Sequence, residues 1–331
     1  MSGERQGVRG ENDEPGAVVV RELVKRFGET VAIDQVSFTV SRGELFGFIG
    51  PDGAGKTTLF RILTTLMLPD SGSARVLGLD VVADLWSLRR RVGYMPGRFS
   101  LYPDLSVEEN LRFFASVFGT TIERGYEQIA PIYSQLEPFR DRRAGALSGG
   151  MKQKLALSCA LVHRPEILFL DEPTTGVDAV SRREFWDLLA QLRASGLTIV
   201  VSTPYMDEAD RCDRVALMEH GRLLAIDAPA RIAQSFGRSL FAVRVADRYR
   251  ALRAIREFPH THRVYPFGEV LHYTDVRGAV TAAEVGRELS GFLHSRGLPH
   301  VTVSATPPTI EDSFMALMGR AEREGRGAHV A

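Results

Sequence analysis

Gly50-Pro51-Asp52-Gly53-Ala54-Gly55-Lys56-Thr57-Thr58 fits the phosphate-loop pattern Gly-x-x-x-x-Gly-Lys-Ser/Thr at every required position. The backbone N–H groups of such a loop must come close to anionic oxygens, and glycine has no side chain to block that approach. Lys56 can reach β- and γ-phosphates, and the Thr57 hydroxyl can bind a Mg²⁺ ion. The stretch therefore predicts a site for a nucleotide and Mg²⁺.

The segments on either side of this loop favour the same interpretation. Residues 44–50 predict a strand that enters the loop, and residues 57–67 predict the helix that leaves it. The positive end of that helix dipole would face the phosphates. A chance glycine-rich turn is the alternative, and it would not require both elements. We therefore expect an α/β fold of the P-loop NTPase type.

Residues 167–170 form a second apolar run, which ends in the carboxylates Asp171 and Glu172. Such a run predicts a central parallel strand, and ligands bind beyond the carboxyl ends of these strands. Asp171 is placed to hold Mg²⁺, directly or through water, and Glu172 to polarise an attacking water. The alternative, two surface acids at a strand end, is disfavoured by the phosphate loop upstream.

Two other segments are candidates for contact with a nucleotide. Ser148, Gly149 and Gly150 open a predicted helix, whose free N–H groups and hydroxyl can bind an anion or serve only as a helix cap. Phe27 lies in a predicted connection that begins at Lys25. Its ring can stack on adenine, or it can be an ordinary turn aromatic.

The remaining pattern outlines two domains between two tails. Residues 1–16 and 320–331 are predicted tails, residues 17–233 the first domain and residues 238–319 an accessory domain. In the first domain we expect strands at 17–23, 36–40, 72–78, 198–203, 214–219 and 223–226, and helices at 106–118, 126–136 and 204–211. Thr203 is the predicted N-cap of the last helix, with Pro204 at its first position. The other two helices interrupt the strand–helix alternation, so residues about 89–143 are predicted to form a helical subdomain.

The accessory domain carries no cluster that indicates catalysis. The expected elements are strands at 239–245, 261–267, 270–274 and 301–305, helices at 249–258 and 280–296, and an amphipathic closing helix at 307–318. The order β-α-β-β-α-β predicts a small ferredoxin-like unit.

Composition excludes several classes of function. The formal net charge of zero gives no electrostatic reason to expect nucleic acid as a partner. Only four of the 41 basic residues are lysines, so a lysine in the phosphate loop indicates a specific role.

Cys159 and Cys212 lie in apparent helices without metal-ligand spacing and suit a reducing cytoplasm. No stretch approaches the ~20 apolar residues that span a bilayer, and no signal peptide is evident, so we expect a membrane role only through a partner.

The phosphate loop, the Leu-Ser-Gly-Gly segment at 147–150 and the Asp-Glu strand end at 171–172, in this order, resemble the ATP-binding-cassette (ABC) ATPases. The resemblance covers roughly residues 17–233. Gly-Tyr-Met-Pro at 93–96, Ser-Leu-Tyr-Pro-Asp-Leu-Ser at 100–106 and Met-Lys-Gln-Lys-Leu at 151–155 look most like exporter ATPases of the multidrug and antibiotic-resistance kind. In that group a small C-terminal domain ends in a Pro-Thr-Leu-Glu-Asp-like helix, which Pro-Thr-Ile-Glu-Asp at 308–312 matches.

The resemblance implies an ATP-hydrolysing subunit that powers export through a permease on a separate chain, at the cytoplasmic face of the membrane. Two cassettes would pair head to tail, as a homodimer or heterodimer, and the helical subdomain would carry the surface that docks on the permease. Each ATP would lie between one phosphate loop and the partner's signature segment. The implied site residues are catalytic Glu172, the metal ligands Thr57 and Asp171, and the nucleotide contacts Phe27, Gly50, Pro51, Asp52, Gly53, Ala54, Gly55, Lys56, Thr57, Thr58, Ser148, Gly149, Gly150 and Asp178.

Two positions depart from the family pattern where the γ-phosphate would be sensed. Gly97 replaces the usual Gln, which helps to bind Mg²⁺ and the attacking water, and Pro204 replaces the His that contacts the γ-phosphate. Proline offers neither a side-chain donor nor an N–H. Loss of one such donor typically slows a reaction about 10²–10³-fold, so we expect slow hydrolysis with nucleotide binding preserved. A smaller departure is Ala179, where proline is usual.

Three functions are compatible with these residues. The first is the energy-coupling ATPase of an exporter. The second is a regulatory or degenerate cassette that binds ATP, hardly turns it over and completes a partner's site. The third, a cassette ATPase acting on ribosomes or DNA, is disfavoured by the neutral charge, the single cassette and the exporter-like helical segment.

Overall fold

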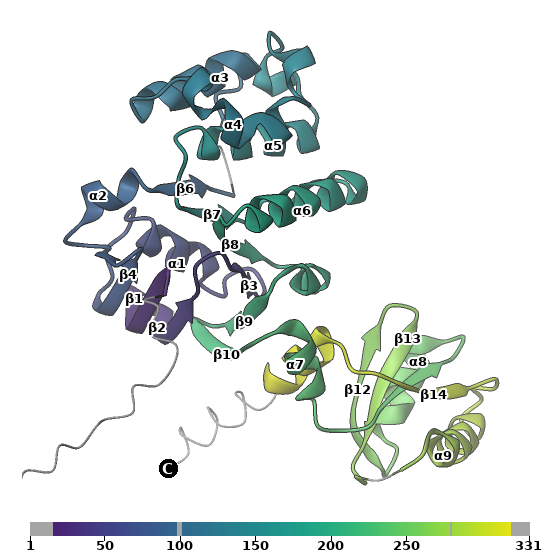
Figure 1. Ribbon diagram of the computed structural model, residues 1–331. Helices are drawn as coiled ribbons and strands as arrows, with labels where there is room; N and C mark the ends of the chain where they lie inside the picture. Colours follow the sequence, from purple (N-terminus) through teal and green to yellow (C-terminus); the bar gives the residue numbers. More distant parts are fainter. Residues whose placement is uncertain (1–15, 98–100, 279, 319–331) are drawn as a thin grey trace, which may run out of the picture. The chain divides into compact units, whose positions relative to one another are not determined.

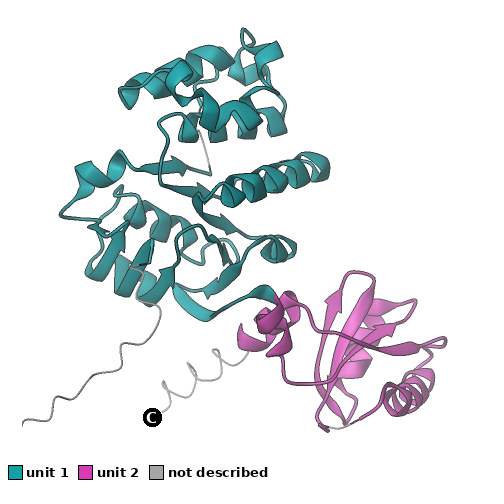
Figure 2. Cartoon of the chain, in the orientation of Figure 1, with its two compact units in different colours: residues 1–229 teal, residues 230–331 magenta. Residues whose placement is uncertain are grey.

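The computed structural model describes residues 16–97, 101–278 and 280–318, and the chain divides into two compact units, 1–229 and 230–331 (Figure 2). The predicted tails, apart from Gly16, lie outside the described residues.

The first unit contains two sheets and a group of helices. Its strands are β1 (Val18–Phe27), β2 (Thr30–Val40), β3 (Leu45–Ile49), β4 (Ser71–Val76), β5 (Leu79–Asp80), β6 (Val92–Met95), β7 (Ile167–Asp171), β8 (Thr198–Thr203), β9 (Arg214–Glu219) and β10 (Arg222–Asp227). Its α-helices are α1 (Lys56–Leu63), α2 (Leu85–Arg89), α3 (Val107–Val117), α4 (Ile122–Tyr133), α5 (Gly149–Leu161) and α6 (Ala179–Ala194). Short 3₁₀ helices cover Glu137–Phe139, Ala144–Ala146 and Met206–Arg211.

A six-stranded sheet with the order β10-β9-β3-β8-β7-β6 forms the centre of this unit. All of its neighbouring pairs are parallel except β10 with β9. Every residue of β3, β7 and β8 is buried, as expected for central parallel strands covered on both faces. A second, antiparallel sheet has the order β2-β1-β4-β5. The predicted P-loop NTPase fold of the α/β class is confirmed.

Helix α1 packs against strands of both sheets, so the core fixes where the phosphate loop ends. The ring of Phe60 on α1 makes edge contacts with Phe48 of β3 and Phe169 of β7, with centroids 5.9 and 5.7 Å apart. These three side chains are fully buried. Edge-to-face aromatic pairs add stability beyond the burial of their area. The loop that precedes α1 is thereby held over the carboxyl ends of the parallel strands.

Helices α3, α4 and α5 form the helical part of this unit (Figure 1). A capping box at Ser106 and Glu109 starts α3, and the Thr121 side chain caps α4. The buried amide of Asn110 on α3 donates to the backbone carbonyls of Tyr102, Leu105 and Ser106. These bonds hold the segment that leads into the helices.

Several predicted boundaries are wrong. Lys25 and Phe27 belong to β1, and the connection to β2 is the two-residue turn at 28–29. Helix α1 ends at Leu63 rather than at residue 67, because Thr65 adopts a left-handed backbone (φ 64°). The N–H groups of Leu66 and Met67 then donate to the Arg61 carbonyl. Sequence patterning also missed helix α6 and the short elements α2 and β5.

The predicted α-helix at 204–211 is also wrong. Thr203 is the last residue of β8, Pro204 continues the chain outside any helix, and a 3₁₀ helix begins only at Met206. The Thr203 hydroxyl still accepts the N–H of Tyr205 (3.1 Å). Cys212 follows this 3₁₀ helix instead of lying in a helix, whereas Cys159 lies in α5 as expected. Both thiols are buried, and burial raises the pKa of each.

The second unit is a four-stranded antiparallel sheet with two helices and a terminal helix. Its elements are α7 (Pro229–Gln234), β11 (Leu240–Arg244), α8 (Arg248–Arg256), β12 (Thr261–Phe267), β13 (Val270–Asp275), α9 (Ala282–His294), β14 (Thr302–Thr306) and a helix at 310–318. The spatial order β12-β13-β11-β14 is that of the predicted ferredoxin-like unit. Buried side chains of α8 and α9 form a separate core with the sheet.

A buried carboxylate joins the terminal helix to this sheet. Asp312 is fully buried, and its Oδ1 lies 2.6 Å from both the Tyr265 hydroxyl and Nδ1 of His272. Its Oδ2 accepts the N–H and the hydroxyl of Thr309, both at 2.7 Å. Burial alone would raise the pKa of Asp312, but these hydrogen bonds outweigh it and lower the pKa to about 2. The ionised carboxylate is therefore the stable form.

We predict that Asp312→Asn destabilises the second unit by about 2 kcal/mol at neutral pH, because the hydrogen bonds lose their charged acceptor. The folded pKa of Asp312 lies below its usual value of 3.8. The advantage of the wild-type carboxylate is therefore complete above that value and disappears as the pH falls toward 2. Urea unfolding of both proteins between pH 7 and pH 2.5 measures the difference.

Glu269→Gln is the matched control, since Glu269 is exposed at the β12–β13 turn. A difference between wild type and Asp312→Asn that does not change with pH would contradict the proposed charge state.

Candidate functional site

Three parallel strand ends place the candidate residues in one row. Ile49 at the end of β3 pairs with Thr203 at the end of β8, and Asp171 at the end of β7 pairs with Ser202. The N–H of Gly50 donates to the Thr203 carbonyl (3.3 Å). The phosphate loop, the carboxylate strand end and the turn after β8 therefore share one edge of the sheet.

Backbone crowding explains two glycines of the phosphate loop. A Cβ on Gly50 would lie 2.1 Å from the Met218 carbonyl oxygen, and one on Gly55 would lie 2.3 Å from that of Ala32. Gly55 also has φ 103°, which L side chains rarely adopt. Gly55 is the N-cap of α1, so the loop passes directly into the helix N-terminus.

Lys56 is the buried centre of the site. Only 3% of the residue is exposed, and its Nζ donates to the carbonyls of Gly50 (2.7 Å) and Pro51 (3.0 Å). The same Nζ lies 3.2 Å from Oε1 of Glu172. The structure thus brings the predicted lysine and the predicted catalytic carboxylate into direct contact, although they are far apart in the sequence.

One serine, which sequence analysis missed, orients both carboxylate residues. The buried Ser202 hydroxyl donates to Oδ1 of Asp171 (2.7 Å) and accepts the backbone N–H of Glu172 (3.0 Å). That N–H also lies 3.1 Å from the Ser202 carbonyl. Glu172 has a left-handed backbone (φ 51°), which turns its side chain away from the strand direction. Ser202 lies inside an apolar strand, and this unusual position was the available signal.

A second missed residue, Glu208, ties the chain after β7 to the end of β8. Glu208 is 2% exposed, and its carboxylate accepts the hydroxyls of Thr174 (2.8 Å) and Thr203 (2.5 Å). Arg182 Nε lies 3.7 Å from the same carboxylate. The buried charge is therefore partnered, and it holds the backbone on which Pro204 sits.

The two departures from the family pattern both border this row. Pro204 directly follows Thr203. A Cβ on Gly97 would lie 2.9 Å from the Asp171 carbonyl oxygen, so this backbone approaches the carboxylate strand end closely. A side chain at position 97 requires the backbone to shift.

The signature segment begins α5. The Ser148 hydroxyl caps the helix by accepting the Met151 N–H (3.3 Å), and Ser148 and Gly149 are exposed. A Cβ on Gly150 would lie 2.5 Å from the Ser181 hydroxyl, so this segment packs against the start of α6. Among the described residues, no hydrogen bond or ion pair connects Ser148 with its own phosphate loop.

The remaining predicted contacts are spread around the site. Asp178 caps α6 by accepting the N–H groups of Val180 and Ser181, and the bonds to Ser181 lower its pKa. Phe27 is 49% exposed, and Lys25 Nζ lies 5.7 Å from the centroid of its ring. In the loop, Pro51, Asp52 and Gly53 are exposed, Ala54 is buried, and Thr57 and Thr58 are half-buried.

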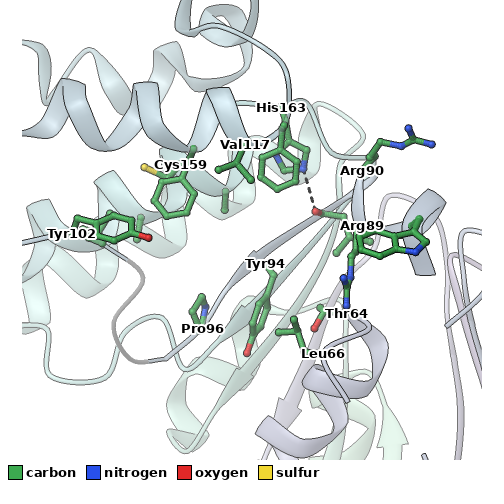
Figure 3. A pocket seen from close by; sticks show the side chains of 17 residues that line it. Thr64, Leu66, Arg89, Arg90, Tyr94, Pro96, Tyr102, Val117, Cys159 and His163 are labelled. Atoms are coloured by element: carbon green, nitrogen blue, oxygen red, sulfur yellow. Dashed lines mark hydrogen bonds between the residues drawn. The ribbon is translucent and has the colours of Figure 1, made fainter. Parts of the chain in front are cut away.

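A cavity of about 960 Å³ opens where the helical part meets the sheet. Figure 3 shows its lining, in which Tyr94 and Pro96 from the β6 side face Tyr102 and Val117 from the α3 side. His163 stacks on Phe118 at 3.7 Å, and its Nε2 lies 3.1 Å from the Val92 carbonyl oxygen. Burial lowers the pKa of His163, so its ring is neutral at pH 7. Exposed Trp86 and Leu66 add apolar surface to the lining.

None of the helices in the described part of the chain combines the length and hydrophobicity needed to cross a membrane.

Known proteins match up to 92% of the chain. The family described as ABC transporter matches residues 33–175. The probable multidrug ABC transporter ATP-binding protein YbhF of Escherichia coli K12 is 45% identical over 219 residues, which are 65% of this chain and 38% of that protein. The chain thus spans well under half of YbhF. The Nod factor export ATP-binding protein I of Rhizobium sp. N33 is 37% identical over 309 residues, 92% of this chain and 97% of that protein.

Solved structures match about two thirds of the chain. An ATP-binding subunit of an ABC transporter has a TM-score of 0.61 at 29% identity, covering 67% of this chain and 93% of that one. A dimeric ATP-binding cassette in a post-hydrolysis state, bound to ADP and Pi, has a TM-score of 0.57 at 25% identity, covering 64% and 98%.

We predict that Ser202→Ala lowers nucleotide turnover about tenfold while nucleotide affinity changes little, because Asp171 and Glu172 lose a shared orienting hydroxyl. Steady-state kinetics with equilibrium binding of a fluorescent nucleotide separates the two effects. Ser202→Thr keeps the hydroxyl and should retain most of the activity.

Ser195→Ala is the control, since its hydroxyl only bonds a carbonyl of its own helix. An equal loss of affinity and turnover in Ser202→Ala would contradict a positioning role.

Proposed function

The chain belongs to the ATPase subunits of ABC transporters, and from this premise we propose that it powers export through a separate membrane permease. Its relatives are named for multidrug transport and Nod factor export, which supports an exporter. Because those cargoes differ chemically, we infer that the permease selects the substrate. The subunit would then lie in the cytoplasm, on the inner face of the membrane.

The observation that carries this proposal is the 3.2 Å contact between Lys56 and Glu172. It supports a single site in which a buried cation meets a carboxylate at the end of a parallel strand. Lys56 would bind the β- and γ-phosphates of ATP, and Glu172 would accept a proton from the attacking water. Lys56 Nζ contacts two loop carbonyls and Glu172. The phosphates of ATP would compete with these three partners for the ammonium group, and Glu172 would then be free to face the water.

The residues also fit a Mg²⁺ ion. Thr57 and Asp171 offer a hydroxyl and a carboxylate, the hard oxygen ligands that Mg²⁺ prefers. When bound, Mg²⁺ would offset charge on the phosphate oxygens. Ser202 would keep the Asp171 carboxylate turned toward this position.

Two cassettes would form the working ATPase, as a homodimer or a heterodimer. The exposed Ser148 and Gly149 at the N-terminus of α5 support this pairing, since they have no hydrogen bond to their own phosphate loop within the described residues. They would contact the ATP held by the partner cassette. The dimeric form of a similar cassette supports the same arrangement.

The cavity beside β6 would receive the permease. Its apolar lining and the exposed Trp86 and Leu66 fit a short apolar helix of a membrane protein. Movement of the helical part on ATP binding would then be transmitted to that helix.

Slow hydrolysis is the second part of the proposal. No side chain at Gly97 or Pro204 can donate a hydrogen bond to the γ-phosphate, and Pro204 also lacks an N–H. Loss of one such donor typically costs about 10²–10³ in rate. The same two residues favour a second candidate function, a nucleotide-gated regulatory subunit that completes a partner's site. Single-turnover trapping of ADP and phosphate separates the two: an exporter ATPase completes a turnover, whereas a gating subunit retains ATP.

We predict that Pro204→His raises steady-state ATP turnover by about tenfold or more, because it returns a donor to the γ-phosphate position. Pro204→Ala restores only the N–H and isolates the backbone effect. Glu172→Gln measures contaminating ATPase in the same preparation.

Gly97→Gln is best added second, because its Cβ must displace backbone near Asp171. Rapid turnover of the wild-type chain, unchanged by the double variant, would overturn the proposal of impaired hydrolysis.

A further inference from the structure

Strand β14 forms an open edge of the ferredoxin-like sheet in the second unit. It pairs with β11 in an unbroken antiparallel register, from Arg244 opposite Thr302 to Leu240 opposite Thr306. Among the described residues, no backbone hydrogen bond reaches its other side. Alternate N–H and C=O groups of β14 therefore point outward and can pair with another strand.

The opposite edge of the sheet is protected against pairing with another strand, whereas the β14 edge is not. Strand β12 contains Pro266, which cannot donate to a neighbouring strand, and Arg263, and its register shifts after Thr261. Natural sheets use such residues to prevent unwanted pairing. Strand β14 has no charge, no proline and no register shift.

The sequence of β14 is nearly self-complementary. It reads Thr302-Val303-Ser304-Ala305-Thr306. Antiparallel pairing of two copies about Ser304 places threonine opposite threonine and valine opposite alanine. Threonine pairs across strands are favourable, and no like charges meet. Ser304 and Ala305 at the centre are exposed.

We propose that β14 of this chain pairs with β14 of a second copy, so that two four-stranded sheets join as one sheet of eight strands. The pairing is isologous, because each copy offers the same surface about a two-fold axis at Ser304. Pro307 and Pro308 follow β14 directly and limit the pairing to five residues.

A contact this short buries less than the ~1,000 Å² of a stable interface, so it is weak alone. It strengthens any other association of two copies by raising the effective concentration of one chain near the other. The pairing uses only the second unit and does not depend on ATP. An experiment can therefore disprove the pairing while the proposed ATPase function holds. It can equally disprove the ATPase function while the pairing holds.

Disulfide cross-linking of the full chain without nucleotide tests the pairing. Residues 304 of two copies would face each other at the axis, within the Cα separation that a disulfide allows. Ser304→Cys should cross-link rapidly under mild oxidation, since the natural cysteines are buried. His262→Cys, exposed on the protected strand β12, is the control and should cross-link only by chance collision. Equal rates for the two variants would overturn the proposal.

Charge substitution provides an independent test by sedimentation equilibrium. Ser304→Lys and Ser304→Glu should each weaken self-association about fivefold or more, because like charges meet at the axis. An equimolar mixture of the two variants should restore it, because opposite charges then meet. Failure of the mixture to associate better than either variant would contradict the pairing.

A chain ending at residue 318 tests the remaining alternative, that the chain's own last residues cover β14. Self-association unchanged by this truncation supports the proposal. Pairing that appears only after truncation would overturn it.

Discussion

The shared ends of three parallel strands are the constraint on which the nucleotide site depends. Residues that are separated by more than 100 positions meet because β3, β7 and β8 lie side by side in register, with every residue buried. The aromatic contacts of Phe60 then hold α1 beneath the phosphate loop. Without that register, Lys56 and Glu172 would have no reason to be in contact.

The same edge connects the nucleotide site with the cavity. Tyr94 of β6 lines the cavity and packs against the core, and burial together with the nearby charge of Asp171 raises its pKa to about 12. Gly97 follows on the same segment, where an added Cβ would lie 2.9 Å from the Asp171 carbonyl oxygen. A change in the groups bound to Asp171 would therefore take place close to the cavity proposed to receive the permease. This holds although position 97 lacks the usual glutamine.

Local patterns predicted the buried strands and the ferredoxin-like order of the second unit. A strand buried on one face has apolar residues at alternate positions, and a strand buried on both faces has a continuous apolar run. Local patterns failed where backbone geometry decides. Helix α1 ends early, at Leu63, because the nearby Thr65 has a left-handed backbone that no propensity indicates. The segment after β8 looks helical, but the carboxylate of Glu208 holds Thr203 in the strand and delays the turn to Met206. Phe27 reads as a turn residue, but tertiary pairing extends β1 through it.

The sequence by itself determined the chemistry available to this protein: a phosphate loop, two strand-end carboxylates, a signature segment and the two positions, Gly97 and Pro204, that lack the usual donors. Each is a local pattern whose meaning depends on residue type and spacing. Only the tertiary structure decided which groups touch. It brought Glu172 into contact with Lys56 and gave Ser202 and Glu208 their positioning hydrogen bonds. It also left the edge of β14 open, whereas β12 is protected against pairing. These are contacts between distant segments, and their distances follow from strand register and core packing, which no local pattern encodes.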